Sequence, residues 1–330
     1  MDREGIRGLQ EKLTQKKKNG VWRFFINTSN KLMGWENALN LWVEIDNISQ
    51  DSGWGEASKF MLSKMKIEID AGGDVGKIKR NKKATLVVGI NHEAILEPFI
   101  LAALLGKRRS ALVSLKVLQL LGKGYKKYIL PVMPRRYAVD EKRFAKWIVN
   151  KVHPRGRFYG IEQLRAVEID EMNEKVFEQS VKKLEDGEDV ILFAPGGKVV
   201  QSSWGRSSGE IICRINKKKI KDVRVAFFKF GGITQLETAR RFWKAANGRG
   251  MEKLKVKVES REGFGVEELK NILGDNFNPK GVVEYLKMWS LEEFGYNKAV
   301  EKKIWNFPKF IYQPAYAKLM TLLTFIRVRL

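Results

Sequence analysis

A histidine and a glutamate five positions apart, His92 and Glu97, form the pair of residues in this sequence best suited to acid–base chemistry. An imidazole held by a carboxylate can take a proton from an alcohol, and histidine changes its charge near neutral pH. The chain has only one other histidine, His153, so few imidazoles can act as a base. On one continuous helix, five positions correspond to about 140° of rotation, and the two side chains would diverge. The pair therefore requires a break between a loop and a helix.

Pro98 gives a reason for that break. An apolar run at 84–90 predicts a strand before the histidine, and a second run at 98–105 predicts a helix after the glutamate. Proline at the first position of a helix loses no hydrogen bond, so we expect Glu97 at the N-cap and Pro98 next to it. The carboxylate of Glu97 can then turn back toward His92, whereas Glu93 faces away in most geometries.

Two further stretches can bind an anion at the ends of predicted strands. The strand expected at 189–193 opens into Gly196, Gly197 and Lys198, where backbone N–H groups and a lysine can hold a phosphate. The spacing is not that of a P-loop. The strand expected at 128–133 is followed by Arg135 and Arg136. Taken alone, each stretch is also typical of a plain turn or of a solvated strand end.

Strands and helices alternate along the middle of the chain, which predicts an α/β fold with a mixed, largely parallel sheet flanked by helices. We expect this domain at residues 75–262, after a helical N-terminal extension at 1–74 that ends in a loop at Ala71–Gly73. A helical C-terminal extension with an amphipathic basic tail is expected at 263–330. Ligands of such sheets bind at the carboxyl ends of strands, where His92 and the glycine stretch both fall.

Charge and composition limit the partners. Lys and Arg number 62 against 38 acidic residues, a formal net charge of +24 that indicates nucleic acid, an acidic membrane surface or phosphorylated substrates. The single cysteine excludes an intrachain disulfide, and no metal-ligand constellation, dinucleotide fingerprint or serine nucleophile elbow occurs. No apolar run reaches the roughly 18 residues of a spanning helix, and the N-terminus lacks the apolar core of a secretory signal. We expect a cytoplasmic protein that meets a membrane only at its surface.

In their order along the chain, these motifs resemble the conserved blocks of the glycerolipid acyltransferase superfamily, the lysophosphatidate and glycerol-phosphate acyltransferases. The family's first block, Asn-His followed by four residues and Asp, reads here from Asn91 to Glu97. Its second, an apolar strand ending in arginine, reads from Ile129 to Arg136. Its third, Phe-Pro-Glu-Gly-Thr-Arg, and its fourth, Val-Pro-Val-Ala, read 193–198 and 223–226. The resemblance covers residues 80–260.

The sequence departs from the family pattern at several positions. Glu97 replaces the aspartate, as it also does in the lipid A-type and mannoside acyltransferase branches. Pro195 and Gly197 stand where the family has Glu and Thr. Lys198 replaces an arginine, which keeps the charge but loses the bidentate fork of the guanidinium. These departures leave open a catalytically weak or inactive homologue that binds lipid.

The resemblance implies transfer of a fatty acyl group from acyl-CoA or acyl carrier protein to a hydroxyl of lysophosphatidate or glycerol phosphate, with no metal and no cofactor besides the acyl thioester. It implies His92 as the general base and Glu97 as the residue that fixes its tautomer. The implied substrate-binding residues are Asn91, Arg135, Arg136, Gly196, Gly197 and Lys198. It also implies attachment to the inner face of a membrane that carries anionic lipid. The rival suggested by the charge is a nucleic-acid-binding protein, but no recognised nucleic-acid module occurs.

Overall fold

The computed structural model describes residues 35–81, 83–92, 94–106, 109–114, 123–132, 165–194 and 204–295. The chain divides into two compact units. One consists of Glu44–Met133 and Glu171–Tyr296 and contains all the strands described below. The other consists of Met1–Val43, Pro134–Asp170 and Asn297–Leu330, and only residues 35–43 and 165–170 of it are described. The predicted basic C-terminal tail lies outside the described residues.

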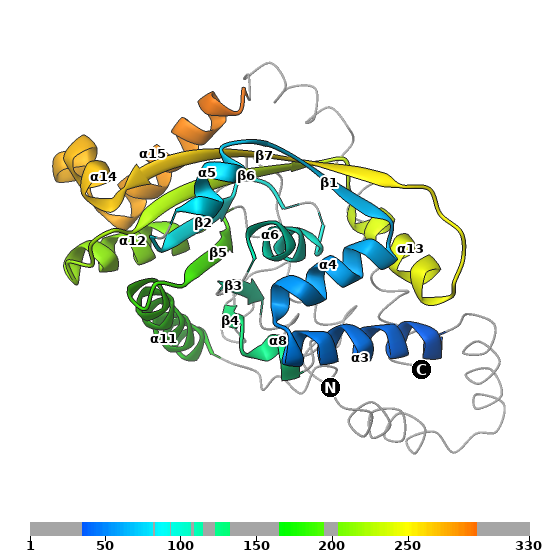
Figure 1. Ribbon diagram of the computed structural model, residues 1–330. Coiled ribbons are helices and arrows are strands. Elements are labelled where there is room, and N and C mark those ends of the chain that lie inside the picture. The colour runs from blue at the N-terminus through cyan, green and yellow to red at the C-terminus, as the bar shows by residue number, and fades with distance from the viewer. Residues whose placement is uncertain are drawn as a thin grey trace, which may run out of the picture. The chain divides into compact units, whose positions relative to one another are not determined.

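The first of these units is built on a seven-stranded sheet (Figure 1). Its strand order is β1-β7-β6-β2-β5-β3-β4, and every neighbouring pair is parallel except β6 and β7. The prediction of a mixed, largely parallel sheet flanked by helices is confirmed. The strands are β1 Ile67–Gly73, β2 Thr85–Gly89, β3 Arg109–Ser114, β4 Ile129–Val132, β5 Asp189–Phe193, β6 Arg224–Gly231 and β7 Leu254–Gly265.

Strand β2 lies near the middle of the sheet, between β5 and β6. All five of its residues are buried, as expected for a continuous apolar run covered on both faces. Its carboxyl end, at Gly89, pairs with Phe193 of β5 and with Phe228 of β6. Residues that follow Gly89 are therefore placed at the centre of the sheet's carboxyl edge.

Helices lie on both sides of the sheet (Figure 1). They are α3 Trp35–Asp51, α4 Trp54–Lys64, α5 Val75–Arg80, α6 Glu97–Leu105, α8 Lys123–Lys126, α11 Ala166–Glu185, α12 Ser207–Lys217, α13 Gln235–Ala246, α14 Val266–Leu273 and α15 Pro279–Glu293, with a short 3₁₀ turn at Gly274–Asn276. Helices α4 and α6 approach closely at Gly55, where an added Cβ would lie 3.2 Å from the carbonyl oxygen of Ala102.

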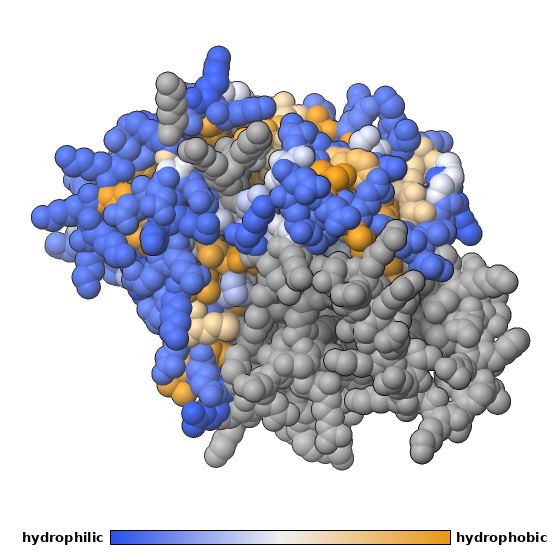
Figure 2. Space-filling view, turned by 60° about the horizontal axis from the view of Figure 1, so that its bottom comes forward, coloured by the Kyte–Doolittle hydropathy of each residue, from blue (hydrophilic) through white to orange (hydrophobic). Residues whose placement is uncertain are grey.

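One continuous hydrophobic core joins β2, β5 and β6 to α11, α12, α14 and α15. Alternate residues of the strands, such as Leu86 and Val88 of β2, face apolar residues of these helices, such as Ile211 of α12 and Leu286 of α15. On the outside, Arg214 of α12 pairs with acidic side chains of α11 and α12. Hydrophilic residues cover much of the coloured surface in Figure 2, with hydrophobic residues visible between them.

The structure differs from the sequence prediction at the end of β1. The loop predicted at Ala71–Gly73 is wrong, because these residues are the end of β1, which pairs in parallel with β7. Helices α14 and α15, predicted within a separate extension, contribute Leu269 and Leu286 to the core of the sheet. The domain boundaries at residues 75 and 262 stay predictions, but strand β1 and these two helices pack with the elements between those boundaries.

Candidate active site

His92 lies in the loop between β2 and α6, at the carboxyl end of β2. We call residues 90–96 the histidine loop; all of them except Glu93 are described. The predicted break between loop and helix is present, with Glu97 as the first residue of α6 and Pro98 in its first turn. The N-cap is Leu96 rather than Glu97, so the helix begins one residue earlier than expected. Pro98 is tolerated there because first-turn N–H groups have no partner within the helix.

The imidazole of His92 forms a hydrogen bond through Nδ1 to Oε2 of Glu97. The side chain of His92 is 26% exposed, whereas that of Glu97 is fully buried. The second carboxylate oxygen, Oε1, accepts the backbone N–H of Ala94 at 3.2 Å. Glu97 is thus fixed from two directions. When Nδ1 donates to this carboxylate, Nε2 is the nitrogen that carries the free lone pair.

The ring of Phe193, the last residue of β5, stacks on the imidazole. The two ring centroids are 4.5 Å apart and the planes are inclined by 28°. Gly89 makes room for this ring, since a Cβ at that position would lie 2.3 Å from Cδ1 of Phe193. Phe193 also contacts Phe230 of β6. This contact could not be predicted from the sequence, because it depends on the register in which β5 pairs with β2.

Asn91 connects the histidine loop to the end of β6. Its side-chain Nδ2 donates to the carbonyl oxygen of Phe230 at 2.7 Å, and its Oδ1 accepts the N–H of the same residue at 2.8 Å. Asn91 is 2% exposed. Substrate binding by Asn91 stays a prediction, but the hydrogen bonds of this amide hold the loop in place.

A second side chain holds the loop from the other side of His92. Oε1 of Gln235, the first residue of α13, accepts the N–H of Ile95 at 2.8 Å. The sequence offered no sign of this contact, because the two residues are 140 positions apart and glutamine is an ordinary helix residue.

The predicted anion-binding residues Arg135, Arg136, Gly196, Gly197 and Lys198 lie outside the described residues, as does His153. The strands that precede them in the sequence are β4 and β5. Strand β5 is the direct neighbour of β2, and the chain is again described from Trp204, where the N–H of Gly205 donates to the carbonyl oxygen of Ala194 at 2.8 Å.

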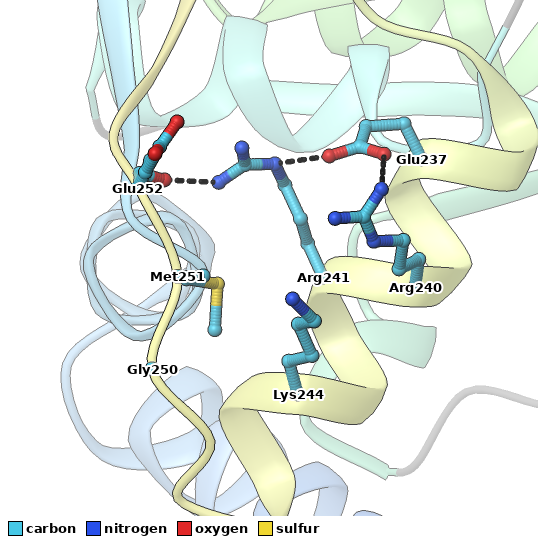
Figure 3. Close-up of a pocket in the computed structure, with 7 residues that line it drawn as sticks. All are labelled: Glu237, Arg240, Arg241, Lys244, Gly250, Met251 and Glu252. Carbon is cyan, nitrogen blue, oxygen red and sulfur yellow. Dashed lines mark hydrogen bonds and ion pairs between the residues drawn. The ribbon is translucent and has the colours of Figure 1, made fainter.

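A separate concavity of about 420 Å³ lies along α13 (Figure 3). Its lining residues are Glu237, Arg240, Arg241, Lys244, Gly250, Met251 and Glu252. The guanidinium of Arg241 donates to Oε1 of Glu237 at 2.8 Å and to the carbonyl oxygen of Glu252 at 2.9 Å. It also donates to the carbonyl oxygen of Met65 at 3.1 Å. Arg241, which is only 7% exposed, therefore fastens α13 to two other segments of the chain.

The single cysteine, Cys213, is a poor nucleophile in this setting. Burial, with a smaller contribution from the nearby carboxylate of Glu210, raises the pKa of its thiol to about 11. Cys213 is therefore a protonated thiol at neutral pH, and nucleophilic chemistry requires the thiolate.

Two kinds of feature are absent from the described ranges. No group of three or more His, Cys, Asp or Glu side chains in them is arranged to hold a metal ion. No helix in these same parts of the chain combines the length and apolarity needed to cross a bilayer.

Comparisons with known proteins find similarity in structure but none in sequence. No family model matches the sequence, and no curated protein matches it. The fold is similar to the crystal structure of the 1-acyl-sn-glycerophosphate (LPA) acyltransferase PlsC from Thermotoga maritima, at 13% sequence identity and a TM-score of 0.35. The similarity covers 80% of this chain and 93% of that chain. At this identity and TM-score, the chemistry of the present chain has to be argued from its own residues.

Proposed function

We propose that this protein is an O-acyltransferase that moves a fatty acyl group from a thioester to a hydroxyl of a lipid precursor, with His92 as the general base. The observation that carries the proposal is the hydrogen bond between His92 Nδ1 and the buried carboxylate of Glu97. It leaves Nε2, on a partly exposed ring, as the proton acceptor.

The proposed reaction needs no covalent enzyme intermediate. Nε2 of His92 takes the proton of the acceptor hydroxyl while its oxygen attacks the thioester carbonyl. Glu97 stabilises the imidazolium that forms. The tetrahedral intermediate then collapses, the carbon–sulfur bond breaks, and the imidazolium returns the proton to the leaving thiolate. The products are an ester and a free thiol, and the imidazole is neutral again.

A histidine–carboxylate pair serves many reactions, so the substrate classes rest on the resemblance of the sequence blocks. On that basis the donor is acyl-CoA or acyl carrier protein, and the acceptor is lysophosphatidate or glycerol phosphate. We propose that Arg135, Arg136 and Lys198 bind phosphate, together with backbone N–H groups at Gly196 and Gly197.

The net charge of +24 supports a place for this reaction on the inner, cytoplasmic face of an anionic membrane. Each Lys or Arg near such a surface contributes about 1 kcal/mol to binding. Binding to vesicles that contain anionic lipid should exceed binding to neutral vesicles and weaken with added salt. Equal binding to anionic and to neutral vesicles would contradict the proposed attachment to an anionic membrane.

Release of free thiol tests the reaction directly. The purified protein, incubated with a long-chain acyl-CoA and lysophosphatidate, should release thiol and form phosphatidate only when the acceptor is present. Substitution His92→Gln should lower turnover by about 10²–10⁴-fold, the usual contribution of a general base. Wild-type turnover in this variant would exclude His92 as the base. Absence of turnover in the wild-type protein with acyl-CoA and with acyl carrier protein, each tested with lysophosphatidate and with glycerol phosphate, would exclude the enzyme.

A lipid-binding homologue without activity is the second candidate, favoured by Pro195 and Gly197 at the family's Glu and Thr positions. It predicts that the wild-type protein binds vesicles containing lysophosphatidate but releases no thiol. The thiol assay and the vesicle assay together separate the two functions.

A further inference from the structure

The histidine loop is held at Ile95 by a side chain from a distant helix. Gln235 accepts the N–H of Ile95 at 2.8 Å, in a partly buried setting. A loop amide has no partner supplied by regular secondary structure, so its position depends on the acceptor it finds. In this loop that acceptor comes from α13 and not from the loop itself.

Short contacts lead from Ile95 to the imidazole. The neighbouring residue, Ala94, donates its N–H to Oε1 of Glu97 at 3.2 Å. The other carboxylate oxygen bonds to Nδ1 of His92. Because the peptide unit between Ala94 and Ile95 is planar, a shift of the Ile95 N–H moves the backbone that orients Glu97. The acceptor on α13 therefore acts on the orientation of the carboxylate.

Helix α13 is itself firmly fixed, which makes it a suitable support. Thr234 caps its first turn by accepting the N–H of Glu237 at 3.2 Å. Figure 3 shows Arg241 reaching from α13 to Glu252, with Glu237 holding its Nε. The same guanidinium binds the carbonyl oxygen of Met65, just before β1. A helix fastened in this way keeps Gln235 in place when the loop is displaced.

We propose that Gln235 is a positioning residue of the active site. It fixes Ile95, and through Ala94 it keeps Glu97 in the orientation that binds Nδ1 of His92. The inference rests on the proposed function only for its effect on turnover, since the effect on the His92–Glu97 hydrogen bond can be measured without any substrate.

Two substitutions of similar size distinguish the effect of losing the hydrogen-bond acceptor from the effect of changing the side-chain volume. Gln235→Met keeps the length but removes the acceptor oxygen, whereas Gln235→Glu keeps an oxygen at the same place. We expect kcat to fall on the order of 10-fold in Gln235→Met with little change in the KM for the thioester, because small misplacements of reacting groups lower the rate steeply. Gln235→Glu should restore most of that loss. Leu236→Ala, at the adjacent and 65% exposed position, is the control and should leave kcat unchanged.

The proton between Nδ1 of His92 and Glu97 gives a second readout, by proton NMR of the ligand-free protein. Its resonance, assigned by its loss in His92→Gln, should move or broaden in Gln235→Met and keep its position in Leu236→Ala. An unchanged resonance in Gln235→Met overturns the proposal, whatever the stability of the variant. In an active protein, an unchanged kcat overturns it as well. If the wild-type protein has no turnover, the proposed function fails, and the resonance alone decides the role of Gln235.

Discussion

Two buried or nearly buried glutamates at opposite ends of the central strands have very different partners. Glu97, beyond the carboxyl end of β2, is fully buried and bonds to an imidazole and to a backbone amide. Glu262 of β7, near the amino end of β6, forms ion pairs with Lys77 and Arg224, whose side chains are 66% and 41% exposed. Ion pairs with exposed partners contribute little to stability, and their geometry is easily replaced. Glu97 thus holds an imidazole from a buried position, as the proposed general base requires, whereas Glu262 binds cationic side chains that reach into solvent.

The largest effect is expected from removing the charge of each glutamate in turn. Glu97→Gln removes the carboxylate that fixes the tautomer of His92 and stabilises the imidazolium, so turnover should fall by about 10²–10⁴-fold. Glu262→Gln, the matched control at the other end of the strands, should leave turnover unchanged. The thiol-release assay measures the turnover of both variants. Equal losses of turnover would contradict the different roles assigned to Glu97 and Glu262.

A smaller effect, on the free energy of unfolding, is expected from substitutions at the last residues of β2 and β6. Gly89 and Gly231 are the last residues of β2 and β6, but only Gly89 is covered, by the ring of Phe193. Gly89→Ala should reduce the free energy of unfolding by about 1–3 kcal/mol, since the ring of Phe193 has to shift to admit a methyl group. Gly231→Ala, with no atom within 4 Å of the added Cβ, should stay within about 0.5 kcal/mol of the wild type. Denaturant unfolding measures both, and equal stability of the two variants would contradict the close packing at Gly89.

The smallest effect concerns the pH dependence of stability. The hydrogen bond from Lys77 holds the pKa of Glu262 below its ordinary value of 4.5, against the opposing effect of burial. A lowered pKa in the folded state stabilises the protein above pH 4.5, and this stabilisation is lost as the pH falls through the folded-state value. Glu262→Gln should therefore be less stable than the wild type at neutral pH by under about 1 kcal/mol. The difference should shrink as the pH falls below 4.5, and a difference of the same size at neutral and at acidic pH would show that charge is not its cause.

The parts of the site that the sequence could predict are those whose residues are close together along the chain. The separation of His92 from Glu97 and the proline at position 98 were enough to predict a loop, a helix start and a carboxylate turned toward the ring. The contacts of Phe193 and Gln235 depend on which strands are neighbours and in which register they pair. That information lies in packing between segments roughly 100–140 residues apart, which no local pattern contains.

The fold, too, could be predicted where local sequence patterns determine it, but not where it depends on contacts between distant segments. The alternation of apolar segments was enough to predict a mixed, largely parallel sheet, because each strand's own pattern reveals it. The end of β1 was missed because alanine and glycine at positions 71–73 have little intrinsic preference for a strand. In the structure they are extended and paired with residues of β7 that lie 187 positions further along the sequence.

That pairing of β1 with β7 has a consequence for the order in which the protein assembles during synthesis. Ile67 leaves the ribosome almost 190 residues before its partner Leu254. At typical elongation rates of about 5–20 residues per second, β1 waits about 10–40 s for the strand that it pairs with. Until then the sheet's final edge cannot form, and an unpaired strand is a hazard for association with other chains. Several residues of β1 are polar or small. They reduce the tendency of the unpaired strand to associate with other chains before β7 is synthesised.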